Sequence, residues 1–399
     1  PSKREDDMWD DLRDYRLLEG DCLEMMRDIE SNSIDALITD PPYGIGFMGK
    51  DWDSSVPGLD WARECLRVLK PGGHIVAFSG TRTIHRLAVA IEDAGFEIRD
   101  TIHWCYTSGF PKSNNISKQF DREAGLLAPE GKGTTYEDCE RIVYTPTIEP
   151  KDYTPPKPQS ELAKKYKGFG TGLKPAIEPA TLARKPIERG LSVARNIKKY
   201  GVGGLNIDGS RFAYGDDCWI GDSTAPPSVP QPIFKNQASR TYGHGSGNGR
   251  IDEFSKPHDS GRWPANIFQC SKPSRAEREA GLEHLEEEIL RSKMNLANGQ
   301  GDRFDGNSSP NYSNFHPTVK PVKLFRWLCR LLGGLPGNTI LDPFCGSGTT
   351  GVSAILEGFN FIGIEREPRY LPIIRGRLDW SREEYKRQNA QLNLFSEVS

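Results

Sequence analysis

The chain has 399 residues, enough to bury a sizeable core in about two domains or in one domain with a large insertion. Its net charge of −3 excludes binding to a polyanion through overall charge, so any such binding has to be local. No apolar stretch approaches the ~20 residues that span a bilayer, and the charged residues 3–7 are unlike a signal peptide. We therefore expect a soluble cytoplasmic protein.

The eight cysteines are scattered and show no C-x-x-C spacing. This pattern argues against a zinc site and against a disulfide framework. We expect no bound metal, and we expect most of the cysteines to be small buried thiols.

The first quarter of the chain alternates between predicted strands and helices. Strands are predicted at residues 15–18, 34–39, 74–78 and 96–104, and helices at residues 23–29, 59–69 and 83–94. This rhythm is typical of an α/β fold with a doubly wound, mostly parallel sheet.

Asp40, Pro41, Pro42 and Tyr43 follow the second of these strands, and open α/β sheets bind ligands where strands end. Pro42 forces Pro41 into an extended conformation, so the Pro41 carbonyl can lie beside the Asp40 carboxylate. Two such acceptors can hold both hydrogens of an –NH2 group on a flat heterocycle and free the nitrogen lone pair, while Tyr43 would stack on the ring. The alternative is a proline-stiffened turn. For residues 47–53, which follow the quartet, we expect either a mobile loop over the ligand crevice at the strand end or a surface turn with a buried Trp52.

The alternation stops after about residue 108. Residues 151–200 hold twelve Lys and Arg against four Asp and Glu, and they include Tyr166, Phe169 and a flexible run at 168–172. This mixture suits phosphate contacts and base stacking, although a solvated basic surface is the alternative. Further on, strands are predicted at 205–208 and 263–270, and an acidic helix at 274–290. The candidate nucleic-acid contacts are Lys50, Trp52, Lys112, Lys174, Arg184, Lys185 and Arg211.

A second set of functional residues lies near the C-terminus. A predicted strand at 338–341 opens on the glycine-rich residues 342–350, followed by a helix to residue 356 and a strand at 359–364. Gly346 and Gly348 let the backbone approach a ligand, and Glu365 is placed to bind ribose hydroxyls. Pro-Phe replaces the first glycine of G-x-G-x-x-G, so we expect Phe344 to pack on a cofactor, and a generic Rossmann unit is the alternative.

Together, the quartet and this loop resemble the DNA amino-methyltransferases that use S-adenosylmethionine. The quartet resembles the family's [DNS]-P-P-[YFW], and residues 342–350 resemble its D-P-F-x-G-S-G-T-T. Residues 316–321 resemble H-P-[TA]-x-K-P, which borders the methionine end of the cofactor, and residues 20–22 resemble G-D-C, whose Asp meets the cofactor adenine. The motif order is that of the β class. Segments at 110–113 and 172–186 also resemble phage and prophage members.

The resemblance implies methylation of an exocyclic amine on a base flipped out of double-stranded DNA, as in restriction–modification. In this family Asp at the start of the quartet leans toward the 6-amino group of adenine, and cytosine-N4 is the alternative. Methylation at a cytosine ring carbon needs a Cys nucleophile, usually in Pro-Cys, which the chain lacks. The implied catalytic residues are Asp40, Pro41, Pro42 and Tyr43. The implied cofactor contacts are Asp21, Cys22, His316, Thr318, Lys320, Asp342, Phe344, Cys345, Gly346, Ser347, Gly348, Thr349 and Glu365.

We predict a catalytic half at residues 12–128, a target-recognition insertion at 129–312, a cofactor-binding half at 313–380 and a tail at 381–399. The tail contains Gln391, Leu392, Leu394 and Phe395, which resemble the Q-L-x-L-F peptide that docks bacterial proteins on the replicative sliding clamp. Packing of this peptide on its own domain is the alternative.

Two other classes of function stay open from the sequence. A nicotinamide-dependent oxidoreductase would account for the C-terminal βαβ unit but gives no role to the quartet or to the basic insertion. A catalytically silent DNA-binding protein would account for the insertion but has no need of an intact cofactor loop.

Overall fold

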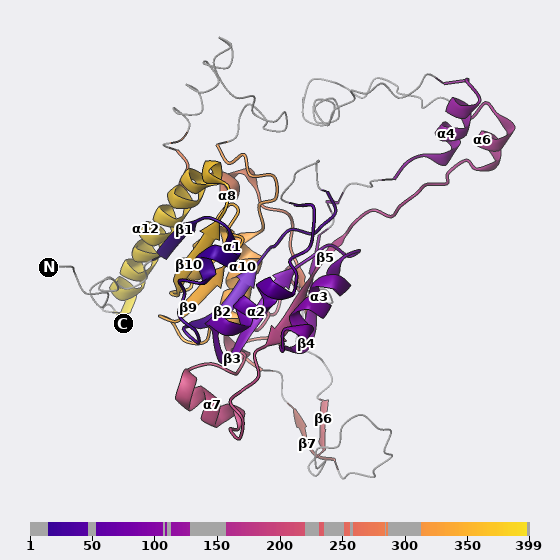
Figure 1. The fold of residues 1–399 in the computed structure, drawn as a ribbon. Coiled ribbons are helices and arrows are strands. Elements are labelled where there is room, and N and C mark those ends of the chain that lie inside the picture. The colour runs from indigo at the N-terminus through magenta and orange to yellow at the C-terminus, as the bar shows by residue number, and fades with distance from the viewer. Residues whose placement is uncertain are drawn as a thin grey trace. The chain divides into compact units, whose positions relative to one another are not determined.

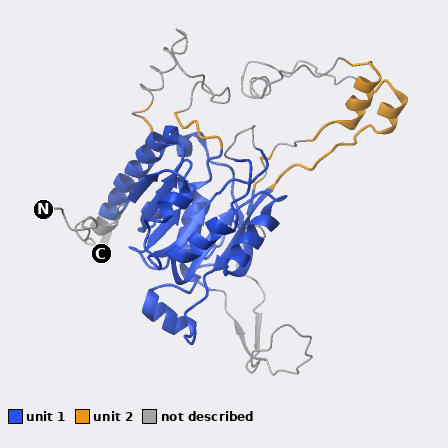
Figure 2. Ribbon diagram, in the orientation of Figure 1, with its two compact units in different colours: residues 1–105, 177–281, 318–399 blue, residues 106–176, 282–317 orange. Residues whose placement is uncertain are grey.

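The computed structural model describes residues 15–46, 53–106, 108–109, 113–127, 157–219, 231–234, 251–255, 258–283, 285 and 313–396. The chain divides into two compact units. The first contains residues 1–105, 177–281 and 318–399, and the second contains residues 106–176 and 282–317 (Figure 2). Three of the predicted nucleic-acid contacts, Lys50, Trp52 and Lys112, lie outside the described residues.

A mostly parallel sheet forms the centre of the first unit (Figure 1). Its order is β1-β10-β9-β2-β3-β5-β4-β8, and only the pairs that β5 makes with β3 and β4 are antiparallel. This sheet confirms the predicted fold class. The strands are β1 (Tyr15–Glu19), β2 (Ile34–Thr39), β3 (Leu69–Phe78), β4 (Glu97–Cys105), β5 (Ile177–Arg184), β8 (Ile267–Gln269), β9 (Thr339–Asp342) and β10 (Asn360–Glu365).

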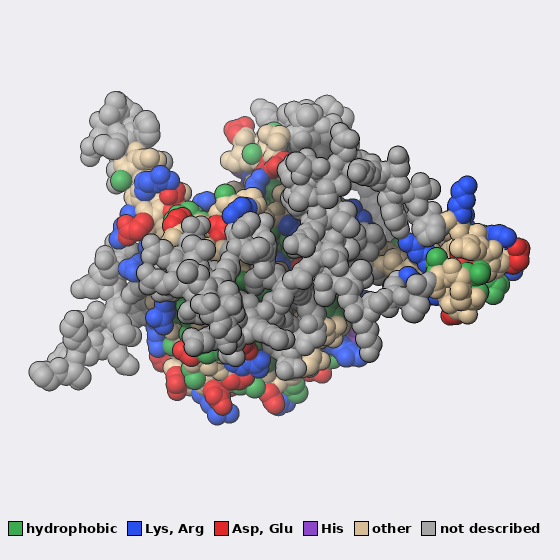
Figure 3. Space-filling view, turned by 90° about the horizontal axis from the view of Figure 1, so that it is seen from above, with side chains coloured by type: hydrophobic (Ala, Val, Ile, Leu, Met, Phe, Trp, Pro, Cys, Tyr) green, Lys and Arg blue, Asp and Glu red, His purple; other side chains and the backbone are tan. Residues whose placement is uncertain are grey.

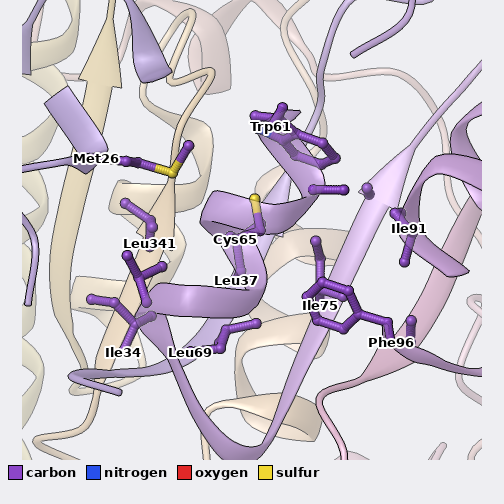
Figure 4. Close-up of a cluster of buried hydrophobic side chains, with 14 of the residues drawn as sticks. Met26, Ile34, Leu37, Trp61, Cys65, Leu69, Ile75, Ile91, Phe96 and Leu341 are labelled. Atoms are coloured by element: carbon purple, nitrogen blue, oxygen red, sulfur yellow. The ribbon is translucent and has the colours of Figure 1, made fainter. Parts of the chain in front are cut away.

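Helices pack on the sheet, and all six residues of β2 are buried, as expected for a central strand covered on both faces. One apolar cluster joins residues of α1, α2 and α3 to β2 and β3, and Figure 4 shows Met26, Trp61 and Ile91 of these helices within it. The helices of the first unit are α1 (Cys22–Met26), α2 (Leu59–Val68), α3 (Ile84–Asp93), α7 (Val193–Tyr200), α8 (Arg275–Glu279), α10 (Val322–Leu332), α11 (Thr349–Leu356) and α12 (Leu371–Ser396).

Strand β5 is the main departure from the predicted organisation. It comes from the range predicted as an insertion, residues 129–312, yet it lies between β3 and β4 in the main sheet. β8, from the same range, also joins this sheet. The sequence signal is weak because β5 contains several small residues and Pro179, and because it ends on the basic Arg184, a pattern more typical of loops.

The other differences are local. No strand forms at residues 205–208: Asn206 N donates instead to Leu331 O at 3.0 Å, and a 3-10 turn, η4 (Asp208–Ser210), follows. α8 is shorter than the predicted helix at 274–290, because Gly281 (φ 81°) follows it, and a Cβ there would lie 2.5 Å from Gly376 O. α12 continues across the predicted boundary at residue 380 into the predicted tail.

Two smaller substructures complete the described chain. β6 (Gln231–Phe234) and β7 (Ile251–Ser255) form an antiparallel pair. In the second unit, α4 (Ile116–Glu123) and α6 (Glu161–Lys165) pack together: Ser117 Oγ donates to Ala163 O at 2.8 Å, and the rings of Phe120, Tyr166 and Phe169 pack in sequence with centroids 5.4–5.5 Å apart.

Two general expectations can be compared with the described residues. The cysteines in this part of the chain are free thiols, and Cys139 lies outside it. Within the described ranges, no helix combines the length and the apolar composition that crossing a bilayer would need.

Candidate active site

Several functional side chains meet at the edge of the sheet where the parallel strands end. β2 delivers Asp40 to this edge, and β3 ends beside it at Phe78. Because β5 runs in the opposite direction, its first residues lie at the same edge, with Ala180 paired to Phe78 and Pro179 O accepting from Ser79 N at 2.9 Å. The reversed strand therefore brings Glu178 to the end of β3.

Asp40, Tyr43, Glu178 and Lys320 form one hydrogen-bonded group, which we call the acid–lysine cluster. The Tyr43 hydroxyl lies 2.9 Å from Asp40 Oδ1 and 3.0 Å from Glu178 Oε2. Lys320 Nζ bonds Asp40 Oδ2 and lies 3.3 Å from Glu178 Oε2 and 3.2 Å from the Tyr43 hydroxyl. The Lys320 side chain is 7% exposed and those of Asp40 and Glu178 are about one fifth exposed.

The charges of the acid–lysine cluster do not balance, because two carboxylates face one ammonium. Burial raises the pKa of Asp40, and the Glu178 charge adds to this rise while Lys320 opposes it. Burial also opposes ionisation of Glu178, but the Lys320 charge and hydrogen bonds from Tyr43 and Lys320 outweigh it and lower the pKa. The two carboxylates outweigh the burial of Lys320 and raise its pKa, so the lysine is charged.

Asp53 holds the backbone of the quartet, a role that sequence reasoning did not predict. Its carboxylate accepts from the N–H groups of Tyr43 at 2.6 Å, Gly44 at 2.9 Å and Ile45 at 3.3 Å, and it is 1% exposed. Gly44 has a φ of 64°, and a Cβ there would lie 2.8 Å from Val56 N, so the turn requires glycine. An Asp in a glycine-broken polar segment looks like a solvated side chain, which is why sequence reasoning missed it.

The glycine-rich loop begins at Asp342, on the strand next to β2. Thr39 Oγ1 donates to Asp342 Oδ1 at 2.6 Å, and Thr350 Oγ1 donates to Oδ2 at 2.5 Å. Phe344 N donates to Oδ1 at 3.0 Å, and burial raises the pKa of Asp342 to about 6. Asp342 therefore ties β2, β9 and α11 together; a direct contact with a cofactor remains a prediction.

Arg377 on α12 supports the same loop from within the protein. It is 1% exposed, and its Nη1 donates to Ser347 O at 2.6 Å, to Ser347 Oγ at 3.1 Å and to Thr349 Oγ1 at 3.2 Å. Burial lowers the pKa of its guanidinium to about 10. Sequence reasoning missed Arg377 because a single basic residue on a charged helix carries no sign of burial.

Acceptors at neighbouring strand ends can hold a nucleoside. Glu365, at the end of β10, accepts from Gly346 N at 2.7 Å and Glu367 N at 2.8 Å, and burial raises its pKa to about 7. Asp21 follows the adjacent β1 and accepts from Leu23 N at 2.9 Å. Each carboxylate keeps acceptor capacity for hydroxyl donors, and Gly346 (φ 56°) and Gly348 (φ 77°) adopt the left-handed conformation that lets the loop turn. The residues fit a ribose-containing ligand.

The other predicted cofactor residues are placed as follows. Phe344 packs against Trp61, with ring centroids 5.9 Å apart, and Cys345 N donates to Ile364 O at 2.9 Å. Burial raises the pKa of Cys22 to about 12, so this thiol is neutral. Thr318 belongs to the first unit and is partly buried, while His316 is a buried residue of the second unit.

Three of the predicted nucleic-acid contacts have partners within the protein. Arg184 Nη2 bonds Glu97 Oε2 at 2.6 Å, and Lys185 Nζ bonds the carbonyls of Leu66 and Leu69 at 2.7 Å. Arg211 Nε bonds an Asp208 oxygen at 2.8 Å, and its guanidinium lies over the Trp263 ring. These contacts give the three residues structural roles. The fourth, Lys174, is exposed in the second unit.

The chain is similar in sequence to known proteins. Type II methyltransferase M.HpaI of Haemophilus parainfluenzae is 35% identical over 119 residues, which are 27% of this chain and 37% of that protein. DNA adenine methyltransferase YhdJ of Escherichia coli K12 is 24% identical over 401 residues, covering 96% of this chain and 92% of YhdJ. Among solved structures, the PvuII DNA methyltransferase, described as cytosine-N4-specific, aligns over 95% of both chains with 15% identity and a TM-score of 0.45.

A family model described as DNA methylase, N6_N4_Mtase, matches residues 34–376. The match runs from the strand before Asp40, through β5, to the helix that carries Arg377. It thus includes both the acid–lysine cluster and the glycine-rich loop. Because the match covers most of the chain, the protein belongs to the N6/N4 DNA methylase family.

Proposed function

We propose that the protein is a site-specific DNA methyltransferase that transfers a methyl group from S-adenosylmethionine to the 6-amino group of an adenine flipped out of the duplex. The observation that carries this proposal is the hydrogen bond between Thr39 and Asp342. It joins the strand that delivers Asp40 to the strand that opens the glycine-rich loop. An amine-binding carboxylate and a nucleoside-binding loop therefore lie on adjacent strands at one edge of the sheet.

The proposed cofactor site uses the strand ends described above. Glu365 would accept from ribose hydroxyls, Asp21 would face the adenine, and Gly346 and Gly348 would allow close approach of the backbone. When bound, S-adenosylmethionine supplies an electrophilic methyl group on a cationic sulfur. Arg377 and Asp342 hold the loop in place from behind, so that its shape is set before the cofactor binds.

The proposed chemistry of the protein rests on Asp40. Its carboxylate and the Pro41 carbonyl accept the two N–H hydrogens of the target amine, which turns the nitrogen lone pair toward the methyl donor. Most of the rate acceleration would come from positioning two bound reactants and from placing negative charge beside the developing ammonium. The uncompensated carboxylate of the acid–lysine cluster supplies that charge.

Two observations favour adenine over the 4-amino group of cytosine. The quartet begins with Asp rather than Ser, and the relative that matches almost the full chain, YhdJ, is an adenine methyltransferase. Membership of a DNA methylase family accounts for the quartet and the loop together. We therefore favour a DNA methyltransferase over the two other classes of function, a nicotinamide-dependent oxidoreductase and a catalytically silent DNA-binding protein.

The second unit supports contact with DNA. Lys165, Lys167 and Lys174 of this unit are exposed, and so is Phe169, which is 59% exposed and can stack on a base. On the face drawn in Figure 3, Lys and Arg side chains are intermixed with Asp and Glu over the described residues. We therefore expect DNA affinity to depend on these exposed lysines.

The test is incubation of the full chain with methyl-labelled S-adenosylmethionine and mixed-sequence double-stranded DNA, followed by digestion to nucleosides. Labelled N6-methyladenine is the expected product. Labelled N4-methylcytosine would overturn the choice of base, and DNA without label would contradict the proposed function.

Docking on the sliding clamp is a separate proposal. Residues 391–395 are helical at the end of α12, and the side chains from Leu392 onward lie outside the described residues. Deletion of residues 391–399 should abolish capture of the chain by immobilised clamp; unchanged capture would contradict the docking role.

A further inference from the structure

The acid–lysine cluster contains two carboxylates, Asp40 and Glu178, but only Asp40 has a role in the proposed binding of the target amine. Lys320 neutralises one carboxylate, and its ammonium also lies 5.3 Å from the ring centroid of Tyr43 and 5.7 Å from that of Phe78. The charge of Lys272 also acts on Glu178. The two carboxylates and the one ammonium of the cluster sum to one negative charge. This charge can balance the single positive charge that accompanies methyl transfer.

The Tyr43 hydroxyl connects the two carboxylates. It lies within hydrogen-bond distance of both Asp40 Oδ1 and Glu178 Oε2, but a phenol has only one proton to donate. The phenol therefore donates to one carboxylate at a time, and the second carboxylate lies within reach of the same hydroxyl. This geometry is that of a two-step proton relay.

Methylation of an amine releases one proton. The new N–C bond uses the nitrogen lone pair, the methyl–sulfur bond breaks with its electrons remaining on sulfur, and the nitrogen carries a positive charge until a proton leaves. We propose that this proton passes to Asp40 and is then shared with Glu178 through the Tyr43 hydroxyl. This inference rests on the proposed function.

The relay conserves atoms and charge. Asp40 takes a proton from the methylated nitrogen and donates it to the Tyr43 oxygen, while Tyr43 donates its own proton to Glu178. The exchange is reversible, so Tyr43 returns to its starting state and the proton is shared between the two carboxylates. No oxidant or further reactant is needed.

The test compares the variants Y43F and E178Q with the double variant in single-turnover methyl transfer on DNA that the wild type methylates. Each single variant should be slower by about 10²-fold, the lower range for lost proton transfer. The double variant should lose no more than that, because both substitutions interrupt one relay. Cofactor affinity, measured by calorimetry, should be unchanged in E178Q.

A matched control exists on the surface. Glu188 accepts from Lys199 at 2.5 Å and from the Tyr200 hydroxyl, the same three residue types outside the site. E188Q and Y200F should leave the rate at the wild-type value. A cofactor-free measurement adds to this: carboxyl NMR should show the pKa of Asp40 falling in E178Q, because the Glu178 charge that raises it is gone.

The outcomes separate the two proposals. A wild type that methylates no DNA contradicts the proposed function. If the wild type methylates DNA, a wild-type rate in E178Q overturns the relay alone. Losses in Y43F and E178Q that multiply in the double variant would also overturn it, because Glu178 would then only hold Lys320 in place.

Discussion

The acid–lysine cluster and the glycine-rich loop lie on neighbouring strands, and both contain buried acids, but the acids have different partners. Asp40 and Glu178 are bonded to a phenol and an ammonium, whose protons can move. Asp342 accepts from two threonine hydroxyls and a backbone N–H, and Arg377 donates to the loop itself. The difference teaches that buried charge holds the loop rigid in one region, whereas in the other it is available for the proposed chemistry.

The largest expected effect tests the chemical region. Asp40→Ala should slow methyl transfer by at least ~10³-fold, because the target amine loses its charged acceptor. Cofactor affinity should be almost unchanged, since Asp342 and Arg377 hold the loop independently. Rates with labelled cofactor and calorimetric titration measure the two quantities. Asp60→Ala, on the exposed face of α2, is the control. Transfer that survives in Asp40→Ala would remove Asp40 from the mechanism.

The next effect tests rigidity. Arg377→Met should lower the free energy of unfolding by about 3 kcal/mol, because a buried carbonyl and two hydroxyls of the loop lose a charged donor. Urea denaturation measures this loss. Arg375→Met, an exposed position on the same helix, should change stability by no more than about 0.5 kcal/mol. Equal effects of the two substitutions would show that Arg377 does not support the loop.

Glu365 combines two roles, because it holds the glycine-rich loop through a hydrogen bond and would also bind the proposed ribose. Burial raises its pKa to about 7, and hydroxyl donors favour its ionised form. Cofactor affinity should therefore rise about tenfold from pH 6 to pH 8 and should vary less in Glu365→Gln. Calorimetric titration across this range is the measurement, and equal pH dependence in both proteins would contradict the assignment.

The same shift has a consequence for folding. The folded protein holds a proton on Glu365 that the unfolded chain releases above its ordinary pKa of 4.5. The contribution of this group to stability is thus complete below about pH 4.5 and is lost as the pH rises through about 7. Urea midpoints of the wild type should fall over that interval by more than those of Glu365→Gln.

The smallest effect concerns the link between the regions. Thr39→Val should destabilise the protein by about 1–2 kcal/mol, because Asp342 loses the hydroxyl that joins β2 to β9. Thr181 is a matched control: it is buried on β5, and its hydroxyl has no hydrogen-bond partner among the described residues. Thr181→Val should be neutral or stabilising. Similar midpoints for both variants in urea would contradict the importance of the link.

Much of the fold could be predicted because its signals are local. The apolar run of β2 and the glycines of the loop at 342–350 each lie within one short segment. β5 could not be predicted, because its neighbours in the sheet lie about 70 to 110 residues earlier in the chain. Its small residues pack well only between two existing strands, and a sequence window contains neither of them.

The sequence by itself determined that the quartet at residues 40–43 and the glycine-rich loop at 342–350 each follow a strand, because residue type and spacing encode both. Only the tertiary structure decided that the two lie side by side and that Glu178, Asp53 and Arg377 complete them. The physical reason is distance along the chain. The protonation state of a buried charged group depends on partners that folding brings close to it. Lys320 and Asp40, for example, are bonded although they are 280 residues apart in the chain.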